Sequence, residues 1–154
     1  MKTKNNIKSL IMLALTLITI AVGVGTTNVT ADASSHHING KKVAKYAKKF
    51  IGRPYVWGAS SKYAFDCSGL VTYVYKHAAG VKLAHSSRTQ ARQTKRIKLS
   101  SVKAGDLLFW SRRGVVYHVA IATSKNSYVN ALAPGYGVRM GGMGSRPNFA
   151  TRVR

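Results

Sequence analysis

Three polar side chains in apolar segments have the types and spacing required for acyl transfer. Cys67 is the only cysteine of the 154-residue chain and directly follows Asp66 at the start of an apolar run. His118 lies in the middle of a β-rich segment, and Asn130 follows twelve residues later, a spacing suited to the next strand of a hairpin. A thiol nucleophile, an imidazole base and an amide that orients the imidazole are sufficient for this chemistry. These residues predict a Cys-His-Asn site.

Each residue also has a simpler structural interpretation. A free cysteine is most often a small buried hydrophobe, and a lone histidine in an apolar strand is most often a core residue. His77 and His85 are alternative bases. His77, however, lies ten residues from Cys67 on the same predicted helix, about 15 Å along its axis, which is too far for proton transfer. We expect His118 to be the base, with Val116 and Ala120 beside it on one strand face.

The nucleophile is predicted at the N-terminus of a helix over residues 67–79. Apolar residues recur there on one face, and Gly80 supplies the stop signal. Asp66 occupies the N-cap position, where a carboxylate accepts the N–H groups of the first turn. Those N–H groups and the helix dipole are expected to depress the pKa of the Cys67 thiol. The Cys67 N–H can also stabilise a developing oxyanion.

The surrounding segments predict a single α+β domain. A helix with one apolar stripe is expected over residues 41–51, an irregular loop over 53–65, and a shorter helix from Ser86. Apolar β-rich runs follow at residues 104–110, 115–122, 127–133 and 136–140, with a last edge strand at 149–153. Helices followed by strands are typical of an α+β fold in which N-terminal helices pack on an antiparallel β-meander.

Residues 1–33 have the features of a secretory signal peptide. Lys2, Lys4 and Lys8 precede an apolar run over residues 10–25, and small residues follow up to Ala33. A membrane anchor is the alternative, but sixteen apolar residues are fewer than the ~20 that cross a bilayer. We expect a flexible lead-in at 34–41 and the folded domain at 42–154.

Charge and cysteine content restrict the partners. The chain carries 25 Lys and Arg against three acidic residues, and removal of residues 1–33 leaves 22 against Asp66 and Asp106, a net charge of +20. A net positive charge of this size favours a polyanionic binding partner, such as nucleic acid, acidic lipid or an anionic wall polymer. Secretion makes nucleic acid the weakest of the three. A single cysteine excludes an internal disulfide. The spacing of Cys and His predicts no metal site, and we expect no cofactor.

Several segments resemble the NlpC-type cell-wall cysteine peptidases. The stretch RPYVWGASSKYAFDCSGLVTYVY (53–75) is similar to their P-Y-x-W-G and D-C-S-G-[LF]-V blocks. LAHSSRTQ, AGDLLFW, YHVAIA, SYVNALAPGYGVRM and FATRVR resemble further segments of the family in the same order. The resemblance covers roughly residues 42–154.

The resemblance implies a papain-like fold and hydrolysis of peptidoglycan stem peptides at the bond between γ-D-glutamate and the following diamino acid. Cys67 matches the nucleophile, His118 the base and Asn130 the third polar residue. The same match assigns substrate or oxyanion contacts to Tyr55, Asp66 and Ser68. Other implied partners are anionic wall polymers such as teichoic acids, and the implied location is secreted and associated with a Gram-positive cell wall, without nucleic acid or stable membrane insertion.

Two departures from the family pattern keep other functions open. The third polar residue is usually His, whereas here it is Asn130, which can still accept an imidazole N–H. Ala120 and Ala122 replace the Gly and Tyr that usually follow the histidine. A cationic wall-binding or antimicrobial protein with a vestigial site is the alternative from another class, and an acyltransferase or amidase on the same scaffold is a third.

Overall fold

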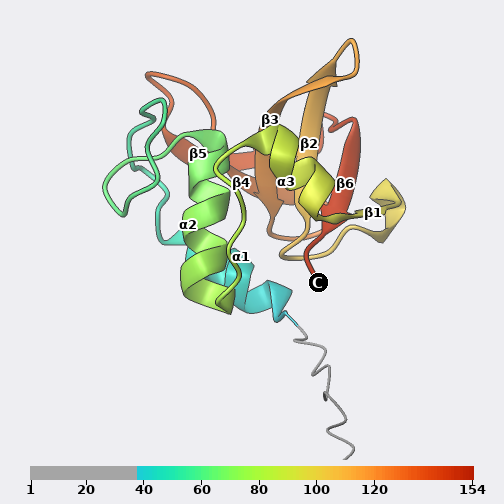
Figure 1. Ribbon diagram of the computed structural model, residues 1–154. Coiled ribbons are helices and arrows are strands. Elements are labelled where there is room, and N and C mark those ends of the chain that lie inside the picture. The colour runs from blue at the N-terminus through green and yellow to red at the C-terminus, as the bar shows by residue number, and fades with distance from the viewer. Residues whose placement is uncertain (1–37) are drawn as a thin grey trace, which may run out of the picture. The chain divides into compact units, whose positions relative to one another are not determined.

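The structure is a computed structural model that describes residues 38–154 (Figure 1). The expected signal peptide and residues 34–37, the first half of the expected lead-in, lie outside these residues. Helix α1 (Gly40–Lys48) begins two residues before the expected domain boundary, because Asn39 caps it by accepting the Lys42 N–H. Within the described range, no helix is long and apolar enough to cross a membrane.

Three α-helices and six strands make up this domain (Figure 1). The other helices are α2 (Cys67–Ala79), α3 (Ser87–Gln93) and the short 3-10 helix η1 (Leu99–Ser101). The strands are β1 (Lys95–Ile97), β2 (Leu107–Arg112), β3 (Val115–Ala122), β4 (Ser127–Ala131), β5 (Val138–Gly142) and β6 (Phe149–Arg152). They form one antiparallel sheet in the order β1-β6-β2-β3-β4-β5. The predicted α+β architecture is confirmed.

The prediction of an edge strand at the C-terminus is wrong. Strand β6 lies inside the sheet, where Thr151 pairs with Arg96 of β1 on one side and with Leu107 of β2 on the other. Strand β1 was not expected because Lys95 and Arg96 are exposed and only Ile97 is partly buried. Charged residues of this kind are characteristic of edge strands, since they discourage pairing with another chain.

Helix α2 is central to the main core, which lies on the side of the sheet that α2 covers. Its bounds match the prediction, because Asp66 caps it and Gly80 ends it with a φ of 70°. Leu70, Val71 and Val74 are at most 1% exposed and pack with apolar residues of β2, β3 and β4. Burial of each such side chain contributes about 1.5–3 kcal/mol. This packing fixes the start of α2 against the sheet.

A second core covers another part of the sheet. Its largest members are Leu108, Trp110 and Tyr128. At the start of β2, Asp106 accepts from Arg152 of β6 at 2.7 Å and 2.8 Å. A buried carboxylate requires such partners. The ion pair links the residue before β2 to the last residue of β6.

Candidate active site

Cys67 is the first residue of α2, and its side chain is largely buried, with 9% of the residue exposed. Burial raises the pKa of the thiol, and the charge on Asp66 raises it further. Hydrogen bonds from the backbone of Val119, Ser68 and Cys67 itself lower this pKa only in part. The predicted depression of the thiol pKa is therefore wrong. The thiol retains its proton at neutral pH, so nucleophilic attack requires a base.

The backbone of Val119, the residue after His118 in β3, is close enough to Cys67 to lower the pKa of the thiol, so Cys67 lies near this strand. Burial lowers the pKa of His118 to about 4. The imidazole is consequently neutral at pH 7 and able to accept a proton. Its ring also packs against Trp110, with 5.3 Å between the ring centroids.

A β-bulge changes which residues flank His118. The register between β2 and β3 shifts after Trp110, so that Tyr117 is an extra residue in β3. Val116 consequently packs with the main core, whereas Ala120 belongs to the second core. The prediction that Val116 and Ala120 share one strand face is therefore wrong. Strict alternation along the sequence does not reveal an inserted residue.

The structure brings His118 and Asn130 together on the neighbouring strands β3 and β4. The Asn130 side-chain nitrogen (Nδ2) lies 2.9 Å from His118 Nε2, and Asn130 is 3% exposed. In this orientation the amide N–H donates to Nε2, which puts the imidazole proton on Nδ1. The sequence predicted the opposite direction, with the amide oxygen as acceptor. That oxygen (Oδ1) is buried without a partner among the described residues.

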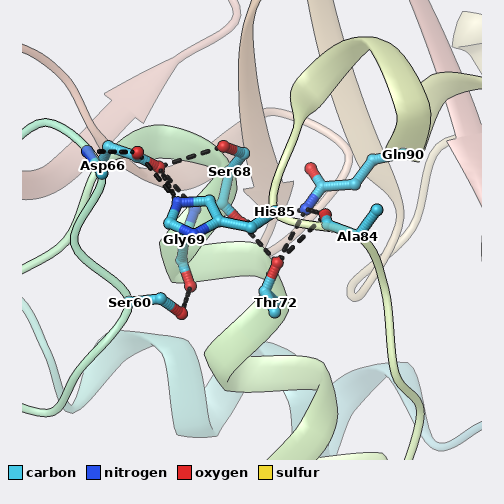
Figure 2. Close-up of polar contacts among 9 residues, drawn as sticks. Ser60, Asp66, Ser68, Gly69, Thr72, Ala84, His85 and Gln90 are labelled. Atoms are coloured by element: carbon cyan, nitrogen blue, oxygen red, sulfur yellow. Dashed lines mark hydrogen bonds and ion pairs between the residues drawn. The ribbon is translucent and has the colours of Figure 1, made fainter.

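Asp66 is the centre of a polar network at the first turn of α2 (Figure 2). Its carboxylate accepts from the Gly69 N–H at 2.6 Å, the Ser68 hydroxyl at 3.0 Å and the Gly58 N–H at 2.9 Å. His85 Nε2 lies 2.9 Å from both carboxylate oxygens. His85, the alternative base, is thus bonded to Asp66. The side chains of Asp66 and Ser68, predicted to contact substrate, are hydrogen-bonded to each other.

Gln90 fixes the position of α3 against the start of α2. It is fully buried, and its side-chain nitrogen donates to Ser68 C=O at 2.9 Å and to Ala84 C=O at 2.7 Å (Figure 2). It also lies 3.1 Å from the Thr72 hydroxyl. This glutamine, whose role the sequence left open, holds together the segments that surround the thiol.

Tyr55 lies in the loop that precedes Asp66 and is partly buried. Burial raises the pKa of its hydroxyl, and the charges of Cys67 and Asp66 raise it further. Tyr55 therefore lies within electrostatic range of the thiol and remains a hydrogen-bond donor at neutral pH. Between residues 38 and 154, no cluster of three or more His, Cys, Asp or Glu is arranged to hold a metal ion.

A cysteine at a helix N-terminus, packed against an antiparallel sheet that carries a paired His and Asn, is the arrangement of papain-like cysteine hydrolases. The family model described as "NlpC/P60 family" matches residues 52–147. The chain belongs to the NlpC/P60 family.

Individual relatives agree with this membership. Protein P54 of Enterococcus faecium is 40% identical over 117 residues, 75% of this chain and 23% of P54. The γ-D-glutamyl-L-lysine dipeptidyl-peptidase of Bacillus subtilis is 39% identical over 75 residues, 47% of this chain and 25% of that enzyme. The chain thus spans about a quarter of the length of either relative. The crystal structure of the NlpC/p60 domain of the peptidoglycan hydrolase SagA superimposes with a TM-score of 0.71 and 40% identity, over 75% of this chain and all of that domain.

Proposed function

We propose that this protein is a secreted peptidoglycan hydrolase that cleaves stem-peptide amide bonds through a thioester on Cys67. One observation carries the proposal: the thiol at the start of α2 lies near the backbone of Val119 in β3, the residue that follows a neutral His118 paired with Asn130. Family membership and the similarity to a γ-D-glutamyl dipeptidyl-peptidase support the substrate class. The predicted signal peptide supports secretion to the wall.

The proposed reaction begins with proton transfer from the Cys67 thiol to His118. The sulfur attacks the scissile carbonyl carbon, and the Cys67 N–H and the Tyr55 hydroxyl stabilise the resulting oxyanion. His118 then gives its proton to the leaving amine, the C–N bond breaks and a thioester remains. Water, deprotonated by the same imidazole, attacks the thioester and releases the new carboxylate and the thiol.

The direction of the Asn130–His118 hydrogen bond matters for this cycle. When Nδ2 donates to Nε2, the imidazole proton is on Nδ1, so neither ring nitrogen is free to accept the thiol proton. The Asn130 Oδ1 atom then has no partner among the described residues. A half-turn of the amide gives Oδ1 the Nε2–H and frees Nδ1 to accept the thiol proton. Only this second orientation leaves a ring nitrogen free to act as the base, which favours it for the reaction. We infer that the reaction uses it.

The bond that we expect to be cut joins γ-D-glutamate to the diamino acid of the stem peptide. Purified peptidoglycan incubated with the mature protein should yield fragments that end in γ-D-glutamate, identified by mass spectrometry of the muropeptides. The masses also report whether the diamino acid is lysine or meso-diaminopimelate. Fragments cut only at the amide between sugar and peptide would contradict the proposal and favour an amidase, and fragments with a newly joined acyl group would favour an acyltransferase.

A cationic wall-binding or antimicrobial protein is the second candidate, and one observation favours it. Within residues 38–154 the two carboxylates, Asp66 and Asp106, are buried and paired with His85 and Arg152. The exposed lysines and arginines therefore have no acidic side chain to neutralise them. Alkylation of Cys67 with iodoacetamide separates the two functions, because it blocks hydrolysis and leaves binding or killing by charge intact.

The same charge supports retention of the enzyme on anionic wall polymers such as teichoic acids. Screening shortens the Debye length from about 10 Å at 0.1 M salt to about 3 Å at 1 M. We expect binding to isolated walls, measured by co-sedimentation, to fall at least tenfold over this range. Walls stripped of their anionic polymers are the control and should bind weakly at both salt concentrations. Unchanged co-sedimentation at 1 M salt would exclude electrostatic retention.

A further inference from the structure

The contact between His85 and Asp66 is not needed to cap α2. The Gly69 N–H, the Ser68 hydroxyl and the Gly58 N–H already use both carboxylate oxygens. His85 comes from a different segment, between α2 and α3, and bridges the two oxygens from outside the helix (Figure 2). Because an ionised carboxylate only accepts, Nε2 must carry the proton of this hydrogen bond.

The position of His85 is defined by its neighbours along the chain. The Ala84 carbonyl accepts from Gln90 of α3 at 2.7 Å and from Thr72 of α2 at 3.2 Å. The Ala84 N–H donates to Gln93 at 3.0 Å. The residue before His85 is thus held by both helices, and the ring contacts Asp66 although its side chain is 32% exposed. The backbone next to His85 is therefore fixed, while the ring itself stays accessible to solvent.

The bridge also lies against the first turn of α2. A Cβ on Gly69 would be 2.9 Å from His85 Nε2 and 2.0 Å from the Ala59 carbonyl oxygen. Only glycine therefore allows the imidazole and the loop before Asp66 to approach the turn that carries Cys67. This close fit makes the His85–Asp66 contact part of the structure around the thiol.

Asp66 works against the nucleophile that it helps to position. Its negative charge lies next to Cys67 and opposes formation of the thiolate. A hydrogen bond from His85 disperses this charge, and a protonated imidazole cancels it. Asp66 is the titratable group that contacts His85. The charge of Asp66 in turn acts on Cys67 and Tyr55. Arg88 of α3 donates instead to the Val116 carbonyl at 3.3 Å.

We propose that His85 is a positioning residue for the nucleophile, acting through Asp66 to reduce the charge that Cys67 meets when it ionises. This inference rests on the proposed function for its biological purpose, but thiol reactivity can be measured without any substrate. His85 does not exchange a proton with the stem peptide in this scheme. That role belongs to His118.

The test is the rate of Cys67 alkylation by iodoacetamide as a function of pH, in the wild type, His85→Ala and His85→Gln. His85→Ala removes both hydrogen bond and charge, and its alkylation profile should move to higher pH, with a several-fold lower rate at pH 7. His85→Gln keeps an N–H donor without the charge and should give a smaller shift. His77→Ala is the matched control, since that exposed ring bonds the Tyr73 carbonyl on the same helix, and it should overlay the wild type.

Profiles of both His85 variants that overlay the wild type would overturn the inference, whatever their activity on peptidoglycan. If His85→Ala fails to fold, as judged by circular dichroism, His85→Gln decides alone. A shifted profile in a protein that does not digest peptidoglycan would support this role of His85 and contradict the proposed function. On soluble stem peptides, we expect His85→Gln to lower kcat and leave KM nearly unchanged.

Discussion

Replacement of Cys67 by alanine is expected to abolish the release of soluble fragments from purified peptidoglycan without unfolding the domain. Removal of the nucleophile from a catalytic set that acts as a unit costs about 10⁶-fold in kcat. Folding should be preserved, because Ala is the best helix former and Cys67 loses only a sulfur atom at the first position of α2. Turbidity loss of peptidoglycan measures the activity, and circular dichroism measures the fold.

Two further variants make this result specific. Cys67→Ser preserves the side-chain shape but ionises with much more difficulty than a thiol, so it should also be inactive. Ser100→Ala changes an exposed residue in η1 and should retain wild-type activity. Digestion by purified Cys67→Ala protein would remove the thioester mechanism from consideration, and would direct attention to a different nucleophile.

His118→Ala is expected to lower kcat/KM by about 10²–10⁴-fold, the usual contribution of a positioned general base. Asn130→Ala should have a smaller effect, because the base remains and only its orientation is lost. In the wild type, the pKa of about 4 for His118 places the acid limb of kcat/KM near pH 4, since below it the imidazole is protonated and cannot accept the thiol proton. An acid limb near pH 6.5 would contradict a buried neutral base.

The burial of His118 also predicts how the stability of the domain depends on pH. The pKa of His118 is about 4 in the folded domain, against the 6.5 of an unperturbed histidine, which applies to the unfolded chain. The unfolded chain therefore binds the proton first as the pH falls, and the free energy of unfolding decreases from about pH 6.5 down to about pH 4. Urea titrations of His118→Ala should lack this part of the pH dependence, which distinguishes it from the contribution of the carboxylates.

Local signals in the sequence predicted the elements that carry the site. Asp66 and Gly80 mark the ends of α2 correctly, because an N-cap and a left-handed glycine act within one turn of the helix. The spacing of His118 and Asn130 predicted neighbouring strands, since a hairpin connects residues close in sequence.

What the sequence missed depends on long-range contacts. The charged strand β1 exists because β6 returns to pair with it, with Lys95 opposite Arg152. The raised pKa of the Cys67 thiol follows from burial by the whole sheet, which outweighs the local helix terminus. His85 was considered only as a base, and nothing in its neighbourhood along the chain indicates that its ring reaches Asp66, nineteen residues away.

The burial of both described carboxylates has a consequence for how divalent cations would act. Asp66 and Asp106 are engaged inside the domain, so calcium or magnesium meets no exposed acidic side chain on the surface of residues 38–154. If the proposed retention on an anionic polymer holds, these ions would displace the protein by occupying the anionic groups of the polymer, without binding an acidic side chain of residues 38–154. On that proposal the domain would be an exchangeable counterion of the polymer, and the concentration of divalent cations around the wall would set how much of it is bound.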